Sequence, residues 1–353
     1  MTNTSVTSPP LQMADLYERL AKLGLSKKYL RENILPDWWT DEVDQTPGVL
    51  LEGALYLSRR LKIDIASLLT SETPQFVSTA TVKFKTQNTT NLQKAVIPYA
   101  LALRISEMVA YICPSTFSRE ALTSVAAIRS QILEKSPAID LVSVLTFCWS
   151  SGIPVIHLNR FPADVHRFHG MVAHAHSRPV IVVSLNDCSP ARLLFVIAHE
   201  LGHILANHLG ENGCRIDTEI QLESDQSEEN EANQIAAELL LGQPGISYDS
   251  WKKYLSADQL IHQARQYGAL NNTDPGVIAL NIIWNRAQRA KTQKAKGIAW
   301  ATGKKALATL EPEANAPKQI NQLLAQQLHL LSPSDSQNEA ERKDYLQKML
   351  GFH

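Results

Sequence analysis

Residues 195–208, FVIAHELGHILANH, contain two histidines four positions apart and a glutamate directly after the first. On a helix this spacing puts His199 and His203 on one face, so both imidazoles can reach the same ion. The pattern is typical of zinc proteases, in which two neutral imidazole nitrogens bind zinc and the glutamate handles the proton of a water molecule. The apolar flanks indicate a buried helix, where a charged Glu200 is costly unless something nearby compensates it. We therefore predict a Zn²⁺ site with Glu200 as its catalytic base.

A catalytic zinc ion needs a third protein ligand and one position left open for water. His208 is one residue out of register for a third histidine and falls on another face of the helix, so we interpret it as lying behind the site or in solvent. The segment SEENEANQIAAELLLG, residues 227–242, has helical periodicity and contains four glutamates. Glu229 shares a stripe of small residues that can pack closely against Gly202. Glu228 lies on a rival stripe, and periodicity alone leaves both carboxylates open.

Local signals around the motif predict the elements that position it. Ser189 and Pro190 are typical of the start of a helix, which would then carry the two histidines. Two short β-branched runs before it, 152–159 and 178–186, are predicted strands. Residues 210–226 are interpreted as a polar, acidic linker. Five histidines within 157–176 match no metal-binding spacing and are interpreted as surface residues.

These motifs together resemble the ImmA/IrrE-type zinc metallopeptidases over roughly residues 150–285. The resemblance rests on HELGH, on the preceding strand PVIVVSLN, and on ENEANQIAAELLL about 25 residues later. It implies a mostly helical α+β fold, with a small sheet packed on helices and the two motif helices facing each other. It also implies a gluzincin-like ligand set in which Glu229 is the third ligand and Asn233 orients one of the ligands. Known members cut helix-turn-helix repressors in bacteria, so the resemblance implies a protein substrate of that kind.

The N-terminal segment 18–33 resembles the helix-turn-helix of Cro/CI-type DNA-binding proteins. Gly24 falls in the tight turn and Ser26 is a natural N-cap for the second helix. If this region binds DNA, Lys27, Lys28 and Arg31 would make the contacts, because they begin that second helix. The alternative is a protein-interaction domain, since the acidic residues that follow at 37, 41, 42 and 44 are unlike a phosphate-facing loop.

Periodicity and breaker residues divide the chain into five predicted segments. They are a disordered lead (1–10), an all-α helix-turn-helix-like domain (11–74), a helical connector (75–150), the zinc metallopeptidase domain (151–285) and a helical, partly mobile C-terminal region (286–353). Residues 286–305 carry seven basic groups and no acid, a pattern that usually marks a solvated helix face.

Composition narrows the classes of protein that the chain can belong to. Lys and Arg number 34 against 35 Asp and Glu, so no overall charge attracts the chain to nucleic acid or a membrane surface. The four cysteines are far apart, as in a reducing compartment, and we find no signal peptide and no run of about 20 apolar residues. We expect a cytoplasmic zinc-dependent endopeptidase. The alternative is a zinc-containing transcription regulator or sensor without catalysis, which binds DNA or a partner protein.

Overall fold

The computed structural model describes residues 11–77, 89–165, 167–208, 214–217, 226–246, 248, 254–330 and 337–351. Over these ranges the chain is mostly helical and contains one four-stranded sheet, so the predicted α+β class is confirmed. None of the helices in these ranges combines the length and apolar character that crossing a bilayer requires.

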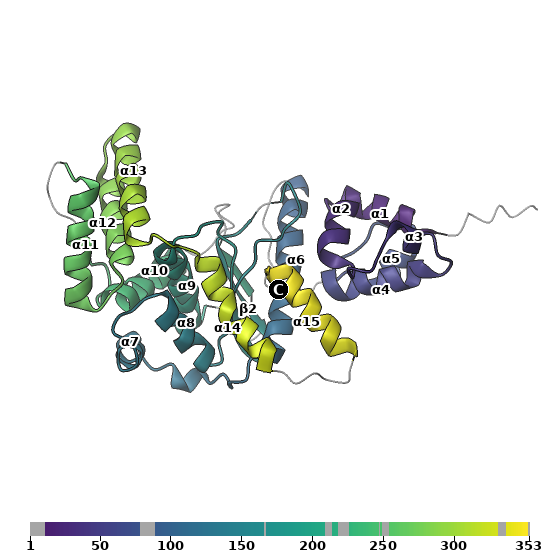
Figure 1. Cartoon of the computed structure of the whole chain (residues 1–353), viewed down its shortest axis with the longest axis horizontal. Helices are drawn as coiled ribbons and strands as arrows, with labels where there is room; N and C mark the ends of the chain where they lie inside the picture. The colour runs from purple at the N-terminus through teal and green to yellow at the C-terminus, as the bar shows by residue number, and fades with distance from the viewer. Residues whose placement is uncertain are drawn as a thin grey trace, which may run out of the picture.

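Short helices at the N-terminus form a layer at one end of the molecule (Figure 1). They are α1 (Met13–Lys22), α2 (Lys27–Tyr29), the π-helical turn η1 (Leu30–Ile34), α3 (Asp41–Asp44), α4 (Val49–Leu61) and α5 (Ile65–Leu69). The turn between α1 and α2 has Gly24 at φ +91°, a left-handed conformation that glycine adopts without strain. Ser26 caps α2 by accepting a hydrogen bond from the backbone N–H of Tyr29 at 3.2 Å. Both local predictions for this turn therefore match the structure.

The middle of the chain supplies the helices around the sheet. They are α6 (Thr89–Ile112), the 3₁₀ turn η2 (Arg119–Ala121), α7 (Val125–Leu133) and α8 (Leu141–Ser150). The sheet consists of β1 (Val155–His157), β2 (Gly170–Ala175), β3 (Arg178–Val183) and β4 (Cys214–Asp217), in the spatial order β1-β3-β2-β4. β1 runs parallel to β3, whereas β2 is antiparallel to both β3 and β4.

Helices cover both faces of this sheet. Val180 and Val182 of β3 belong to the core shared with α6, and Ile181 and Val183 belong to the core shared with α9 (Pro190–Leu205). This division follows from the period of two along a strand, which sends alternate side chains to opposite faces. Because both faces are buried, the strand reads as a continuous apolar run rather than an alternating one.

The second motif helix, α10 (Gln226–Leu241), lies against α9, and three long helices follow it. These helices, α11 (Ala257–Asn271), α12 (Pro275–Arg289) and α13 (Gln293–Leu310), form the end of the molecule opposite to the N-terminal layer (Figure 1). The chain then returns through α14 (Ala316–Leu330), which packs on β1, and α15 (Gln337–Leu350), which packs on η1.

The two ends of the described chain are held together by hydrogen bonds. The hydroxyl of Tyr345 on α15 donates to the carbonyl oxygen of Arg60 at 2.9 Å, and Nζ of Lys348 donates to the carbonyl oxygen of Leu35 at 3.0 Å. Tyr345 is fully buried. The predicted five-segment division stays a prediction, but the C-terminal segment contributes directly to the packing of the N-terminal layer.

Two sequence interpretations were wrong. The segment read as an acidic linker contains strand β4, and the histidines of the segment that contains β2 are not all surface residues: His176 is exposed, but His157 is buried. His157 is not a surface residue: it is 2% exposed, and its Nε2 donates to the carbonyl oxygen of Leu185 at 3.0 Å. Burial lowers the pKa of this imidazole, which favours the neutral form. The remaining parts of the predicted linker, 210–213 and 218–225, lie outside the described residues.

Candidate metal centre

The helix that carries the two motif histidines is fixed at its N-terminus by three residues. Ser189 accepts a hydrogen bond from the backbone N–H of Arg192 at 3.3 Å, and Pro190 occupies the first helical position, as predicted. The carboxylate of Glu311, far along the chain, accepts from the backbone N–H of Ala191 at 2.9 Å. A carboxylate at this end also interacts favourably with the helix dipole. Together these contacts fix the axis and rotation of α9.

Two arginines from the connector hold the C-terminal ends of the two motif helices. Arg119 donates to the carbonyl oxygens of Ile204 and Leu205 at 2.6 and 3.0 Å, at the end of α9. Arg129 donates to the carbonyl oxygens of the last turn of α10 (Leu239 at 2.5 Å and Leu240 at 3.1 Å). The last carbonyls of a helix have no partners within the helix, so these guanidinium groups satisfy them and complement the dipole. Neither arginine was singled out in the sequence.

The two motif helices approach each other at a pair of small residues. A Cβ atom on Gly202 of α9 would lie 2.8 Å from the carbonyl oxygen of Ala232 on α10 and 3.0 Å from its Cα. No side chain larger than hydrogen therefore fits at Gly202 without moving α10. This contact brings the first turn of α10, which carries Glu229, over the histidine face of α9.

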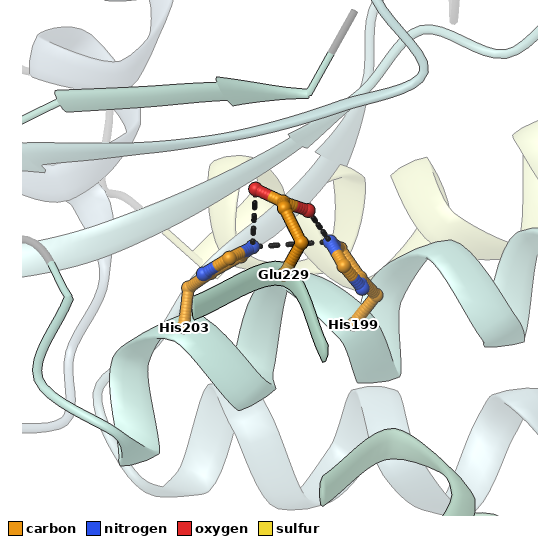
Figure 2. Close-up of side chains that lie close together, drawn as sticks. All are labelled: His199, His203 and Glu229. Atoms are coloured by element: carbon orange, nitrogen blue, oxygen red, sulfur yellow. Dashed lines mark hydrogen bonds and ion pairs between the residues drawn. The ribbon is translucent and has the colours of Figure 1, made fainter. Parts of the chain in front are cut away.

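Three candidate ligands converge at this crossing. The Nε2 atoms of His199 and His203 are 3.0 Å apart, and they lie 3.2 and 3.7 Å from the two carboxylate oxygens of Glu229. Figure 2 shows one nitrogen of each ring facing Glu229 and the other turned away. Both histidines are buried, while the Glu229 side chain is 21% exposed. Among the residues that the structure describes, these three form the group able to hold a metal ion.

The donor set and its spacing fit a zinc ion. Two imidazole nitrogens and one carboxylate are ligands that zinc accepts, and three protein ligands leave a position for water. Ligand bonds of about 2.0–2.1 Å in a tetrahedron place donor atoms about 3.3 Å apart. The separations of 3.0, 3.2 and 3.7 Å lie on both sides of that value, so small side-chain adjustments suffice.

The outer ring nitrogens of both histidines have hydrogen-bonding partners. Nδ1 of His199 is 3.1 Å from Oδ1 of Asn233, the residue for which this role was predicted. Nδ1 of His203 is 2.9 Å from Nδ1 of His208, whose Nε2 is 3.1 Å from a carboxylate oxygen of Glu231. Occupied Nδ1 atoms leave Nε2 of each ring to face the site. The contact with Glu231 was not foreseen, because its helical register indicates a solvated face.

Glu200 is fully buried beside the first residue of β2. A Cβ atom on Gly170 would overlap Oε1 of Glu200 and would lie 2.8 Å from both Cγ of Glu200 and Cγ1 of Val196. The absence of a side chain at Gly170 therefore makes room for the carboxylate. No local sequence signal marks this glycine, because its role depends on a helix that begins twenty residues later.

The basic residues proposed for DNA contact lie in the N-terminal layer and are engaged in ion pairs. Nζ of Lys27 is 2.7 Å from Asp41, and the Arg31 guanidinium is 2.7 Å from Asp44. Lys28 is exposed and lies 3.8 Å from Glu32. Asp41 and Asp44 thus form ion pairs with two of the three basic residues that were proposed to contact DNA.

Comparison with known families supports the resemblance stated for this part of the chain. Residues 148–255 match the family model Peptidase_M78, described as the IrrE N-terminal-like domain. The matched segment contains the whole sheet together with α9 and α10. No curated protein matches the chain. The match indicates a peptidase-type domain around the three converging side chains.

Proposed function

We propose that the protein is a zinc-dependent endopeptidase. The observation that carries this proposal is the convergence of His199, His203 and Glu229 within a segment that matches a peptidase family. Two imidazoles and a glutamate would hold the ion, and Glu200, which follows His199 in the sequence, is fully buried. A purely structural zinc site has no need for such an extra carboxylate, because its four ligands already complete the coordination.

Zinc in such a site supplies Lewis acidity, which makes water more acidic and polarises the carbonyl of a peptide bond. Glu200 accepts a proton as the water oxygen bonds to the carbonyl carbon. Glu200 then gives that proton to the amine nitrogen as the C–N bond breaks, so the carboxylate is regenerated. Asn233 holds the ring of His199 in orientation through its Nδ1 atom.

The substrate that we propose is a helix-turn-helix repressor, cut in the cytoplasm. The repressor follows from the resemblance to ImmA/IrrE-type enzymes, and the peptidase-family match supports a protein substrate in general. Free thiols at Cys113, Cys148 and Cys188 support a reducing compartment.

The competing function is a zinc-containing regulator that binds DNA or a partner without turnover. The ion pairs of Lys27 and Arg31 weigh against DNA reading by the N-terminal layer, because breaking them would cost part of the binding energy. That function becomes the better account only if the protein binds DNA or a partner in a zinc-dependent way and cleaves no candidate.

The test is cleavage of a repressor co-expressed with the wild-type protein or with Glu200→Gln. The amide has the same shape but cannot accept the proton, so turnover should fall by about 10²- to 10⁴-fold. Zinc content should stay at the wild-type level, since Glu200 is not a ligand. Cleavage by the variant at the wild-type rate would refute the role of Glu200. Failure of both forms to bind zinc would overturn the metal site itself.

A further inference from the structure

The chain turns back after the end of α9, and this turn places the ring of His208 against the ring of His203. Asn207 has φ +62°, a left-handed conformation that asparagine tolerates better than most residues. The backbone N–H of His208 donates to the carbonyl oxygen of His203 at 3.1 Å, and that of Asn207 donates to Ile204 at 3.2 Å. This pair of bonds is the Schellman motif, a common way of ending a helix. It brings the two imidazole centroids to 5.1 Å, with the ring planes at 60°.

The hydrogen bonds of these rings continue to the second motif helix. Nδ1 of His203 and Nδ1 of His208 are 2.9 Å apart, and Nε2 of His208 lies 3.1 Å from Oε2 of Glu231. The His208 side chain is 6% exposed, whereas Glu231 is 59% exposed. The chain of contacts therefore runs from the buried centre to the surface.

Only one arrangement of protons satisfies both of these contacts when a metal is bound. A ligand nitrogen must offer a lone pair, so Nε2 of His203 is unprotonated and its proton sits on Nδ1. That N–H donates to Nδ1 of His208, which must then accept, and the proton of His208 is placed on Nε2. There it donates to the carboxylate of Glu231. Each contact has one donor and one acceptor, and the chain ends at a negative charge.

The same geometry excludes other roles for His208. It faces the Nδ1 side of His203, away from Nε2 and from Glu229, so it cannot bind the same ion. Both of its ring nitrogens are already engaged, which removes it as a donor to substrate.

We propose that His208 and Glu231 are positioning residues that fix the tautomer and orientation of His203 and strengthen it as a metal ligand. The inference rests on the proposed metal site. It makes α10 the source of three contacts to one centre: Glu229 as ligand, Asn233 behind His199, and Glu231 behind His203 through His208. Outer hydrogen-bond partners of this kind typically change metal affinity by about 10- to 100-fold.

The experiment measures Zn²⁺ and Co²⁺ affinity of the full-length protein by competition with a chelator. His208→Ala should weaken binding by about 10- to 100-fold. His208→Asn should recover part of that loss, because the amide oxygen can accept from Nδ1 of His203. His262→Ala, a histidine exposed on α11, is the matched control and should bind as wild type. The absorption spectrum of bound Co²⁺ should shift in His208→Ala, because the orientation of a ligand changes.

Glu231→Ala tests whether Glu231, His208 and His203 act together as a hydrogen-bond relay or whether His208 acts by packing alone. This exposed carboxylate contributes little to folding. Glu231→Ala should weaken binding less than His208→Ala, and adding it to His208→Ala should cause no further loss. Glu238→Ala on the same helix serves as the control for removal of one acid. If wild type binds no metal, the proposed function fails. If wild type binds but all His208 and Glu231 variants match it, or if the two losses simply add, the relay alone is overturned.

Discussion

Gly202 of α9 lies so close to Ala232 of α10 that an added Cβ would be 2.8 Å from the Ala232 carbonyl oxygen. Real Cβ contacts of that length do not occur, so one helix would have to move. The three candidate ligands come from both helices, so their spacing depends on this contact.

Replacing Gly202 by alanine should weaken metal binding and destabilise the fold by about 1 to 3 kcal/mol, the usual cost of overpacking a core. Gly297→Ala is the control, because nothing lies within 4 Å of a Cβ at that helical position. There the higher helix propensity of alanine should stabilise by up to about 1 kcal/mol. Chelator competition and urea unfolding measure the two effects. Equal behaviour of the two variants would contradict the close approach.

The two glutamates that periodicity left open differ in the structure. Glu229 has its carboxylate within 3.7 Å of both Nε2 atoms, whereas Glu228 is not part of the group able to hold a metal among the described residues. Glu229→Ala should lose more than the roughly 10- to 100-fold in affinity that outer contacts contribute. Glu228→Ala should retain zinc, as measured by metal analysis of the purified proteins. Zinc retained in Glu229→Ala but lost in Glu228→Ala would reverse the assignment.

Parts of the fold that depend on local chemistry could be predicted from the sequence. Ser189 and Pro190 indicated where α9 begins, and the helix begins there. Gly242, which has φ +84°, comes directly after the last residue of α10. Gly202 was expected to face the small stripe of α10, and it does. In each case the signal is a backbone or size requirement that only a few residue types meet.

The strands β2 and β4 could not be found in the same way. The turn between β2 and β3 is formed by His176 and Ser177, both at positive φ, where the usual signal would be Asn-Gly or Asp-Gly. Without that signal, the histidine-rich sequence did not indicate that β2 is a strand buried between two layers. Arg119 contacts a residue 85 positions later in the chain, and Gly170 makes room for a residue 30 positions later. A prediction made from neighbouring residues in the sequence cannot relate positions so far apart.

Asp44 holds the N-terminal layer together and should make its stability depend on pH. It accepts hydrogen bonds from Trp39 Nε1 at 2.8 Å, Tyr17 OH at 2.9 Å and Arg31 at 2.7 Å. Burial raises the pKa of this carboxyl, but these hydrogen bonds outweigh burial and hold the pKa below its ordinary value. The ionised form is thus favoured in the folded state.

Asp44→Asn should lower the free energy of unfolding by about 1 to 3 kcal/mol at pH 7. A lowered pKa gives stabilisation that is present above the unfolded value of about 3.9 and is lost as pH falls through the folded value. The difference between wild type and variant should therefore shrink below about pH 4. Asp41→Asn, at an exposed carboxyl, should have a smaller effect. Urea unfolding at several pH values measures both, and a difference that stays constant down to pH 3 would rule out the carboxylate as its source.

Gly170 makes room for the proposed catalytic base and should separate catalysis from metal binding. A methyl group there would overlap Oε1 of Glu200 and would also meet Val196 at 2.8 Å, so the carboxylate must shift. None of the three candidate ligands is among the atoms nearest to that methyl group. Gly170→Ala should therefore bind zinc nearly as wild type does but cleave about 10- to 100-fold more slowly, because a misplaced catalytic group slows the reaction.

Gly297→Ala again provides the control, with both properties unchanged. Cleavage at the wild-type rate by Gly170→Ala would mean that Glu200 is not held by this strand, and loss of zinc would mean that β2 supports the metal centre rather than the base.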